Sequence, residues 1–187
     1  TPIRDGQAAR AVTVGFSQPE VDRLFFRLSD TGTFAPYSAP VHLSVPAGTA
    51  RDYALDAYTV DPAGNRTRFS APIRFRLDRT APPVPAILLD GTVVREEYRW
   101  ITEPARISFS ATANGEESHD SDGSVNLEYS ISPATVAPSR PQKWDGSPIT
   151  ITPTENQEER HVFVRAVDAA GNVSPPRTIR LLSDAGA

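Results

Sequence analysis

The same strand-to-turn motif occurs twice in this chain, at an offset of 107 residues. The first copy is Thr59-Val60-Asp61-Pro62-Ala63-Gly64-Asn65, and the second is Ala166-Val167-Asp168-Ala169-Ala170-Gly171-Asn172. A strand with a period of two residues leads into each copy, because apolar residues alternate with others before the turn. An internal repeat of this length predicts a chain built from two similar modules.

Further segments of the two halves align in the same order around this motif. The aligned pairs of segments are 12–14 with 107–109, 25–28 with 128–131, 37–43 with 144–151, and 70–74 with 176–180. The repeat therefore spans most of each module.

Short segments with alternating apolar residues, rather than helical periodicity, fill both halves of the chain. The predicted strands are 11–16, 23–28, 40–45, 53–61, 73–77, 86–89, 92–94, 106–111, 126–131, 147–152, 160–168 and 177–182. The 18 prolines add to this argument, since proline breaks helices and marks loops. Many short strands separated by turns predict an all-β fold with a sandwich in each module.

The boundaries of the modules follow from the proline content between them. We predict module 1 at residues 1–80, a linker at 81–85 and module 2 at 86–187. Pro82, Pro83 and Pro85 hold the linker extended and semi-rigid. Module 2 contains an acidic loop insertion at 114–124, and the pair Asp90-Gly91 predicts a two-residue hairpin.

The residues of the repeated motif are those that a tight turn requires. Asp61 and Asp168 can accept hydrogen bonds from the backbone that follows them. Gly64 and Gly171 supply a positive φ without steric cost. Asn65 and Asn172, at the last position of the motif, tolerate the left-handed region. We interpret the motif as a structural turn that reverses the chain between the last two strands of each module.

The motif also carries a resemblance to a known group of domains. A strand followed by Asp-x-Ala-Gly-Asn, a final strand and Asp78-Arg79-Thr80-Ala81-Pro82 resembles bacterial immunoglobulin-like repeats and the related C-terminal domain of chitobiase and β-hexosaminidase. In the second copy Trp144-Asp145-Gly146 stands in place of Tyr37, and the acidic loop is extra. The resemblance implies two tandem immunoglobulin-like β-sandwich domains. It implies little about function, because such modules serve as spacers, adhesin stalks and enzyme appendages.

Composition excludes several classes of function. The chain contains no cysteine, which excludes disulfides, thiolate metal sites and a cysteine nucleophile. Its net charge of −4 disfavours general binding of nucleic acid. Residues 1–83 hold ten arginines and eight acidic residues, so the negative charge belongs to the second half. No apolar run approaches the roughly 20 residues that span a bilayer, so we expect no membrane insertion by this segment.

Catalysis and metal binding have little support in the sequence. The three histidines, His42, His119 and His161, stand in no motif of a hydrolase or metalloprotease, so we predict no catalytic residues and no enzyme. We predict no cofactor and no metal. The alternative is a calcium site in the acidic loop, whose carboxylates alternate as oxygen ligands often do. Its candidate ligands are Glu116, Glu117, Asp120 and Asp122.

Three large aromatic residues are candidates for ligand binding. Sugar-binding sandwiches stack carbohydrate rings on exposed aromatic side chains, and Tyr58, Trp100 and Trp144 are the candidates in this chain. In the other interpretation, Trp100 and Trp144 fill or cap the core, and Tyr58 forms cross-strand pairs.

These observations lead us to expect a non-catalytic structural or adhesive segment of a larger exported bacterial protein. It would act at the cell surface, outside the cell or in the periplasm, on a protein or glycan partner. The alternative is a carbohydrate-binding accessory module of a glycoside hydrolase. A third option is self-association through an exposed edge strand.

Overall fold

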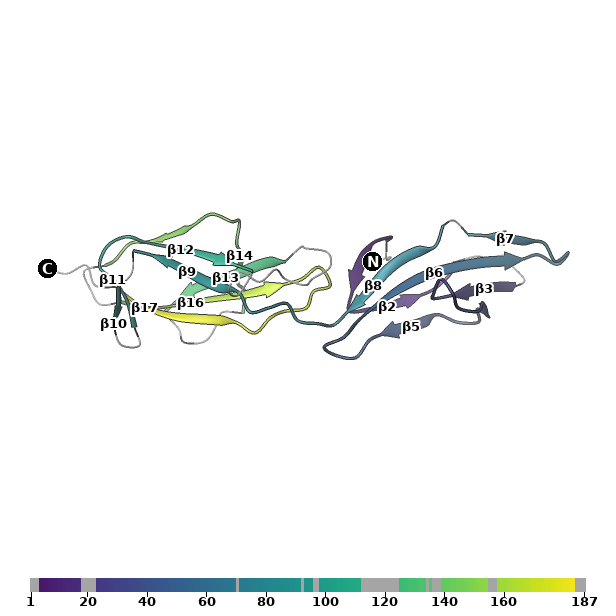
Figure 1. Cartoon of the computed structure of the whole chain (residues 1–187), viewed down its shortest axis with the longest axis horizontal. Helices are drawn as coiled ribbons and strands as arrows, with labels where there is room; N and C mark the ends of the chain where they lie inside the picture. Colours follow the sequence, from purple (N-terminus) through teal and green to yellow (C-terminus); the bar gives the residue numbers. More distant parts are fainter. Residues whose placement is uncertain are drawn as a thin grey trace. The chain divides into compact units, whose positions relative to one another are not determined.

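The computed structural model describes residues 4–17, 23–69, 71–91, 93–95, 98–111, 125–133, 135, 139–154 and 158–183. Every regular element in these residues is a β-strand (Figure 1). The prediction of an all-β fold is confirmed. The chain separates into two compact units, which are Thr1–Thr80 with Ala170–Asn172, and Ala81–Ala169 with Val173–Ala187.

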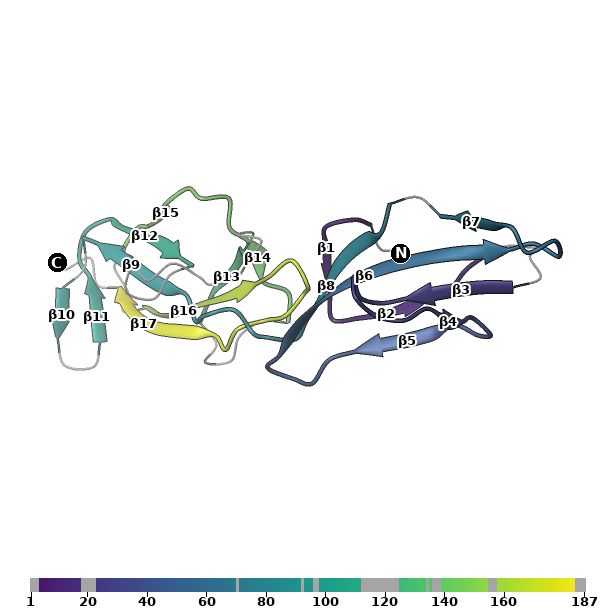
Figure 2. The same ribbon diagram turned by 45° about the vertical axis from the view of Figure 1, so that its right-hand side comes forward.

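Unit 1 contains two sheets. Its strands are β1 (Gln7–Ala9), β2 (Ala11–Val14), β3 (Arg23–Arg27), β4 (Ala35–Pro36), β5 (Val41–Ser44), β6 (Ala50–Val60), β7 (Arg66–Arg68) and β8 (Ile73–Asp78). The larger sheet has the order β1-β8-β6-β3-β4, with β7 also paired to β6. The smaller sheet consists of β2 and β5, which lie together in both views (Figure 2).

Unit 2 also contains two sheets. Its strands are β9 (Ala86–Asp90), β10 (Val93–Arg95), β11 (Tyr98–Ile101), β12 (Ala105–Ser110), β13 (Asn126–Ser132), β14 (Gln142–Lys143), β15 (Ile149–Ile151), β16 (Glu158–Val167) and β17 (Arg177–Ser183). One sheet has the order β10-β11-β17-β16-β13-β14 and the other the order β15-β12-β9.

The core of each unit lies between its two sheets. In unit 2, Ile107 and Phe109 from the smaller sheet form one buried cluster with Val162 and Leu181 from the larger sheet. In unit 1, Phe75 and Leu77 are buried in a cluster that Val12 and Leu43 of the smaller sheet cover. Two sheets that enclose a core in this strand order form an immunoglobulin-like sandwich.

Strand register places the aligned residues of the two halves at equivalent positions. Ile73 lies opposite Leu55 in unit 1, and Ile179 lies opposite Val162 in unit 2. The backbone N–H of Tyr37 donates to the Leu24 carbonyl, and that of Trp144 donates to the Leu127 carbonyl, both at 2.8 Å. The substitution of Trp144 for Tyr37 therefore keeps the backbone geometry at this point.

The predicted hairpin at Asp90-Gly91 is wrong. Strand β9 pairs with β12, whereas β10 pairs with β11 in the other sheet. Gly91 instead has a φ of 81° at the point where the chain leaves one sheet for the other. A Cβ on Gly91 would lie 3.2 Å from the Pro104 carbonyl oxygen. Gly91 is therefore not a hairpin residue, and its missing side chain permits a close approach of the Pro104 backbone.

The sequence interpretation missed five short strands, which are β1, β4, β7, β11 and β14. Strands β1 and β11 run parallel to the last strand of their units, β8 and β17. They have only three and four residues, so neither shows enough alternation to predict a strand. Positions 18–22 and the predicted acidic loop 114–124 lie outside the described residues.

Candidate binding surfaces

The outward face of the larger sheet of unit 1 carries a group of rings, arginines and one carboxylate. We call it the aromatic–arginine layer, and it consists of Phe25, Arg27, Phe34, Asp56, Tyr58, Arg66 and Arg68. Strand register brings these residues together, because Phe25 lies opposite Tyr58 and Arg27 lies opposite Asp56. The intervening residues of β6, Leu55 and Ala57, belong to the other face, as expected for a period of two.

Tyr58 lies at the centre of this layer. Its ring stacks on Phe25 with centroids 5.1 Å apart and an interplanar angle of 13°. Phe34 meets the same ring edge-on at 4.8 Å. The Arg66 guanidinium lies 5.2 Å from the Tyr58 centroid, which is within cation–π range. Tyr58 therefore forms the cross-strand pair of the second interpretation, and its neighbours restrict the ring surface that a sugar needs for stacking.

Asp56 holds two of the three arginines of the layer in place. Its carboxylate accepts hydrogen bonds from Arg27 Nε at 3.2 Å and Nη2 at 2.9 Å, and from Arg68 Nε at 3.0 Å and Nη2. The residue is only 3% exposed. The hydrogen bond from Arg68 lowers the pKa of Asp56, burial opposes that change, and Arg27 lowers the pKa further. Asp56 is thus a buried anion beneath two fixed cations.

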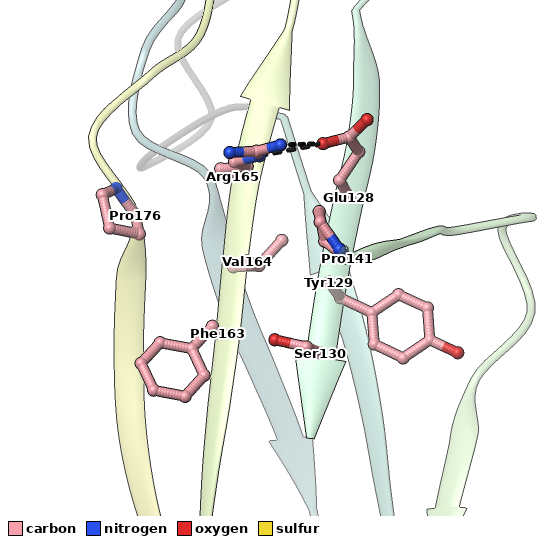
Figure 3. A pocket seen from close by; sticks show the side chains of 8 residues that line it. All are labelled: Glu128, Tyr129, Ser130, Pro141, Phe163, Val164, Arg165 and Pro176. Carbon is pink, nitrogen blue, oxygen red and sulfur yellow. Dashed lines mark hydrogen bonds and ion pairs between the residues drawn. The ribbon is translucent and has the colours of Figure 1, made fainter. Parts of the chain in front are cut away.

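Unit 2 carries different residues at the equivalent positions. Glu128 lies opposite Arg165, where unit 1 has Phe25 opposite Tyr58. Arg165 donates to Glu128 Oε2 from Nε at 2.8 Å, and its Nη2 lies 2.7 Å from the same atom (Figure 3). Phe163 replaces Asp56 and is 6% exposed. The pair of rings in one unit is therefore an ion pair in the other.

A shallow pocket surrounds this ion pair in unit 2. Its cavity volume is about 30 Å³, and Figure 3 shows its lining residues, Glu128, Tyr129, Ser130, Pro141, Phe163, Val164, Arg165 and Pro176. Ligand pockets typically enclose roughly 300–1,000 Å³. This pocket is smaller and open to solvent, so it does not surround a ligand of ordinary size.

Within unit 2, the structure does not bring Trp100 and Trp144 into one site. Trp144 packs edge-on against Phe109 at 5.4 Å, and its Nε1 donates to the Ser147 carbonyl at 2.8 Å. Trp144 also packs against the core of unit 2. Trp100 is a half-buried residue of β11. Trp144 directly follows β14 at the far edge of the same sheet, and three strands separate β11 from β14. Tyr58 belongs to unit 1.

The first copy of the repeated turn is closed by its own side chains. Asp61 accepts hydrogen bonds from the backbone N–H and the Nδ2 of Asn65, both at 2.8 Å. These bonds lower the pKa of Asp61, with the side-chain bond contributing most. Gly64 has a φ of 89°. In the second copy, Gly171 has a φ of 83°, and Asp168 and Asn172 are buried.

The remaining candidates from the sequence are the proposed calcium ligands and the histidines. The proposed calcium ligands Glu116, Glu117, Asp120 and Asp122 lie outside the described residues. Within the described part of the chain, no three acidic or histidine side chains are placed to share a metal ion. His42 lies 3.2 Å from the Thr13 hydroxyl, and His161 Nε2 lies 2.9 Å from Glu159. A helix able to span a membrane does not occur in the described residues.

The sequence interpretation missed Arg27, Asp56 and Arg68. One signal was present, because Asp56 is an acidic residue in the middle of a strand whose neighbours are apolar. A buried carboxylate needs cationic or hydrogen-bonding partners. The sequence does not show which arginines supply them, since Arg27 lies on a different strand.

Comparisons with known proteins complete this description. No protein-family model matches the chain, and no curated protein sequence matches it either. The fibronectin(III)-like modules of Clostridium thermocellum CbhA are 13% identical, with a TM-score of 0.49, over 97% of this chain and 90% of that one.

Two further solved structures are similar over most of this chain. The FN1-FN3 domains of chicken CNTN1 are 14% identical with a TM-score of 0.49, and the match covers 98% of this chain but only 64% of that one. The D00-D0 domain of Intimin is 13% identical with a TM-score of 0.32, over 96% of both chains. We assign the fold from the strand order and the cores described above.

Proposed function

We propose that this chain is a non-catalytic structural and adhesive segment of a larger exported bacterial protein. In this proposal, residues 1–80 and 86–187 are tandem immunoglobulin-like modules joined by a linker at 81–85. The segment binds a protein partner at the cell surface, outside the cell or in the periplasm. The similarity to chitobiase and β-hexosaminidase modules stays a prediction from the turn and linker motifs.

The aromatic–arginine layer carries this proposal. The outward face of a sandwich sheet is normally polar, since the inward face supplies the core. Here that face presents Phe25, Phe34 and Tyr58 between arginine side chains. Aromatic residues and arginine are the types enriched at protein interfaces and among their energetic hot spots.

The internal contacts of the layer also favour binding. Arg27 lies 4.7 Å from the Phe34 centroid while it donates to Asp56. These contacts fix side chains that would otherwise lose rotamer freedom on association, so binding costs less entropy. The positive charge of the arginines favours a partner with acidic and aromatic side chains.

Selection of phage-displayed peptides on the immobilised full chain tests this proposal. We expect the selected peptides to be acidic and aromatic, and to lose at least about tenfold in affinity on Tyr58→Ala or Arg66→Ala. Arg165→Ala at the position equivalent to Tyr58 is the matched control and should leave binding unchanged. Selected peptides that bind all three variants equally would contradict the proposal.

Polysaccharide affinity gels test the carbohydrate alternative in parallel. The ring of Tyr58 has Phe25, Phe34 and Arg66 as neighbours, which weighs against stacking of a sugar on it. We therefore expect no retention of the full chain on cellulose or chitin gels. Retention that Trp100→Ala abolishes would favour a carbohydrate-binding appendage and overturn our proposal.

A further inference from the structure

Two exposed arginines of unit 1 lie on either side of Val60, in one row across the larger sheet. Register places Arg23 of β3 and Arg66 of β7 opposite this residue of β6. The three strands lie side by side (Figure 2). Neighbouring strands are about 4.8 Å apart, so the backbones of the two arginines are roughly 10 Å apart. Both side chains share the outward face with Tyr58, because side chains alternate along each strand.

The two arginines of this row have no carboxylate partner among the described residues. The other arginines on the same face each have one, in the pairs Arg27–Asp56, Arg68–Asp56, Arg74–Asp30 and Arg76–Asp52. Arg66 instead lies 5.2 Å from the centroid of the Tyr58 ring. The carboxylate of Asp61, which follows Val60, accepts its hydrogen bonds from Asn65. Within the described part of unit 1, the charges of this row are therefore available to an anion from outside.

Unit 2 forms the same row without any charge. Register shows that its members are Asn126, Val167 and Val173. In the repeat, these residues align in order with Arg23, Val60 and Arg66. The valine at the centre is kept, and both flanking arginines are replaced by uncharged residues. The sandwich therefore does not require two cations in this row, and their presence in unit 1 calls for another explanation.

We propose that Arg23 and Arg66 bind two acidic side chains of an extended segment of the protein partner. This site rests on the proposed function, because it places the acidic groups of that partner beside the aromatic–arginine layer. A guanidinium binds a carboxylate through two parallel hydrogen bonds, so two arginines suit two carboxylates. Alternate residues of an extended segment are about 6.8 Å apart at their backbones and point to the same side, so two such acidic residues can reach both arginines.

The surroundings of the row favour a short acidic peptide over a long polyanion. Long polyanions bind extended basic surfaces, in which many cations neutralise their charge. Here the other arginines of the face are already paired, with Asp30, Asp52 and Asp56 as their partners. The unpaired charge of this face is thus confined to the row in the described residues. Phe25 and Tyr58 lie next to it on the same face, which suits a peptide that also carries an aromatic side chain.

The test titrates the full chain with two synthetic peptides. One is acetylated and amidated Gly-Glu-Tyr-Glu-Gly, and the other has glutamine in place of both glutamates. NMR of the arginine Nε–H groups in the isotopically labelled chain reports the contact and gives the affinity. We expect saturable shifts at Arg23 and Arg66, and binding of the glutamine peptide that is weaker by about tenfold. Arg23→Gln and Arg66→Gln should each weaken the glutamate peptide by about threefold, and together by about tenfold.

Arg51→Gln is the matched control. Arg51 also lies over a tyrosine ring, 5.4 Å from the Tyr53 centroid, and has no carboxylate partner in the described residues. It lies near the opposite end of β6 from Val60, so its substitution should leave binding unchanged. A charge reversal adds a gain of function, since Arg23→Glu combined with Arg66→Glu should bind a peptide with lysine in place of both glutamates.

Urea unfolding separates a binding role from a structural one. We expect the unfolding midpoint of Arg23→Gln to be unchanged or higher, because the substitution removes the repulsion between two like charges. A lower midpoint would overturn the proposal, as would equal binding of the glutamate and glutamine peptides. Heparin that binds through the same two arginines more tightly than the glutamate peptide would also overturn it. Phage-selected peptides that respond to Tyr58→Ala but not to Arg23→Gln would remove this site alone and leave the proposed function standing.

Discussion

At the scale of single residues, Asp56 organises the outward face of unit 1. It accepts hydrogen bonds from two arginines while it is almost completely buried. Removing one partner of such a group leaves the other charge uncompensated, which costs far more than an exposed ion pair contributes. Because the Arg68 side chain is 59% exposed, part of this interaction is screened by solvent.

Asp56→Asn should lower the free energy of unfolding at pH 7 by about 2 kcal/mol, which is below the cost for a fully buried pair. The pKa of Asp56 is lowered in the folded state, so its contribution is present above its unfolded pKa of about 3.9. The contribution is lost as the pH falls through the folded pKa. Urea unfolding over a pH series should therefore show the two proteins converging in strong acid.

Asp52→Asn is the matched control for this experiment. Asp52 lies on the same strand, but its side chain is 77% exposed and its nearest cation, Arg76 Nη1, is 3.4 Å away. We expect a change within about 0.5 kcal/mol. Equal effects of the two substitutions would show that burial of Asp56 has no energetic consequence.

The turn glycine Gly64 permits a second prediction at this scale. Its φ is 89°, and a Cβ at this position would meet no atom within 4 Å. The cost of Gly64→Ala is therefore purely conformational, and we expect about 1 kcal/mol by chemical denaturation. Gly64→Asn should cost less, because asparagine tolerates the left-handed region. If alanine and asparagine cost the same, the left-handed φ does not determine the stability of this turn.

At the scale of elements, the same pair of strands holds different interactions in the two units. Strands β3 and β6 join through Phe25 and Tyr58, whereas β13 and β16 join through Glu128 and Arg165 at the equivalent positions. Stacked rings gain from burial and dispersion, and ion pairs gain from charge. One strand pairing is therefore supported by two kinds of physical interaction.

Double-mutant cycles distinguish these interactions. We expect a coupling of about 0.5–1.5 kcal/mol for Phe25 and Tyr58 that is insensitive to salt. The partly exposed pair Glu128 and Arg165 should couple by about 0.2–1 kcal/mol and lose most of this coupling in 1 M NaCl. A salt-sensitive coupling between Phe25 and Tyr58 would contradict the stacking account.

The same scale shows how far the sequence could predict the fold. Alternation located long strands such as β6 and β16, because eight or more residues carry a clear period. It missed β1 and β11, whose parallel partners lie far away in sequence. It also misread Gly91, since a local turn signal does not show which sheet the next strand joins.

The candidate surface was predictable to a similar extent. Alternation placed Tyr58 on the face away from the core, but the partners of Tyr58 are set by strand register across β3, β6 and β7. Arg66 and Arg68 stand after the turn, where the sequence alone shows only a run of alternating cations. The sequence therefore identified only Tyr58 in this layer, and the contacts between strands identified its partners.

At the scale of the whole molecule, the two halves divide charge and surface chemistry unequally. Residues 1–83 hold more arginines than acidic residues, and residues 84–187 hold nine basic and fifteen acidic residues. The aromatic–arginine layer belongs to the first half and the Glu128–Arg165 pair to the second. A partner with acidic and aromatic groups should therefore distinguish unit 1 from unit 2.

Mapping of the bound peptide by NMR chemical shifts tests this central claim most directly. The measurement uses the isotopically labelled full chain and a peptide from the phage selection. We predict that the largest shifts fall on the backbone amides of Phe25, Arg27, Tyr58, Arg66 and Arg68. Shifts confined to unit 2, or to residues of unit 1 outside the aromatic–arginine layer, would contradict the claim.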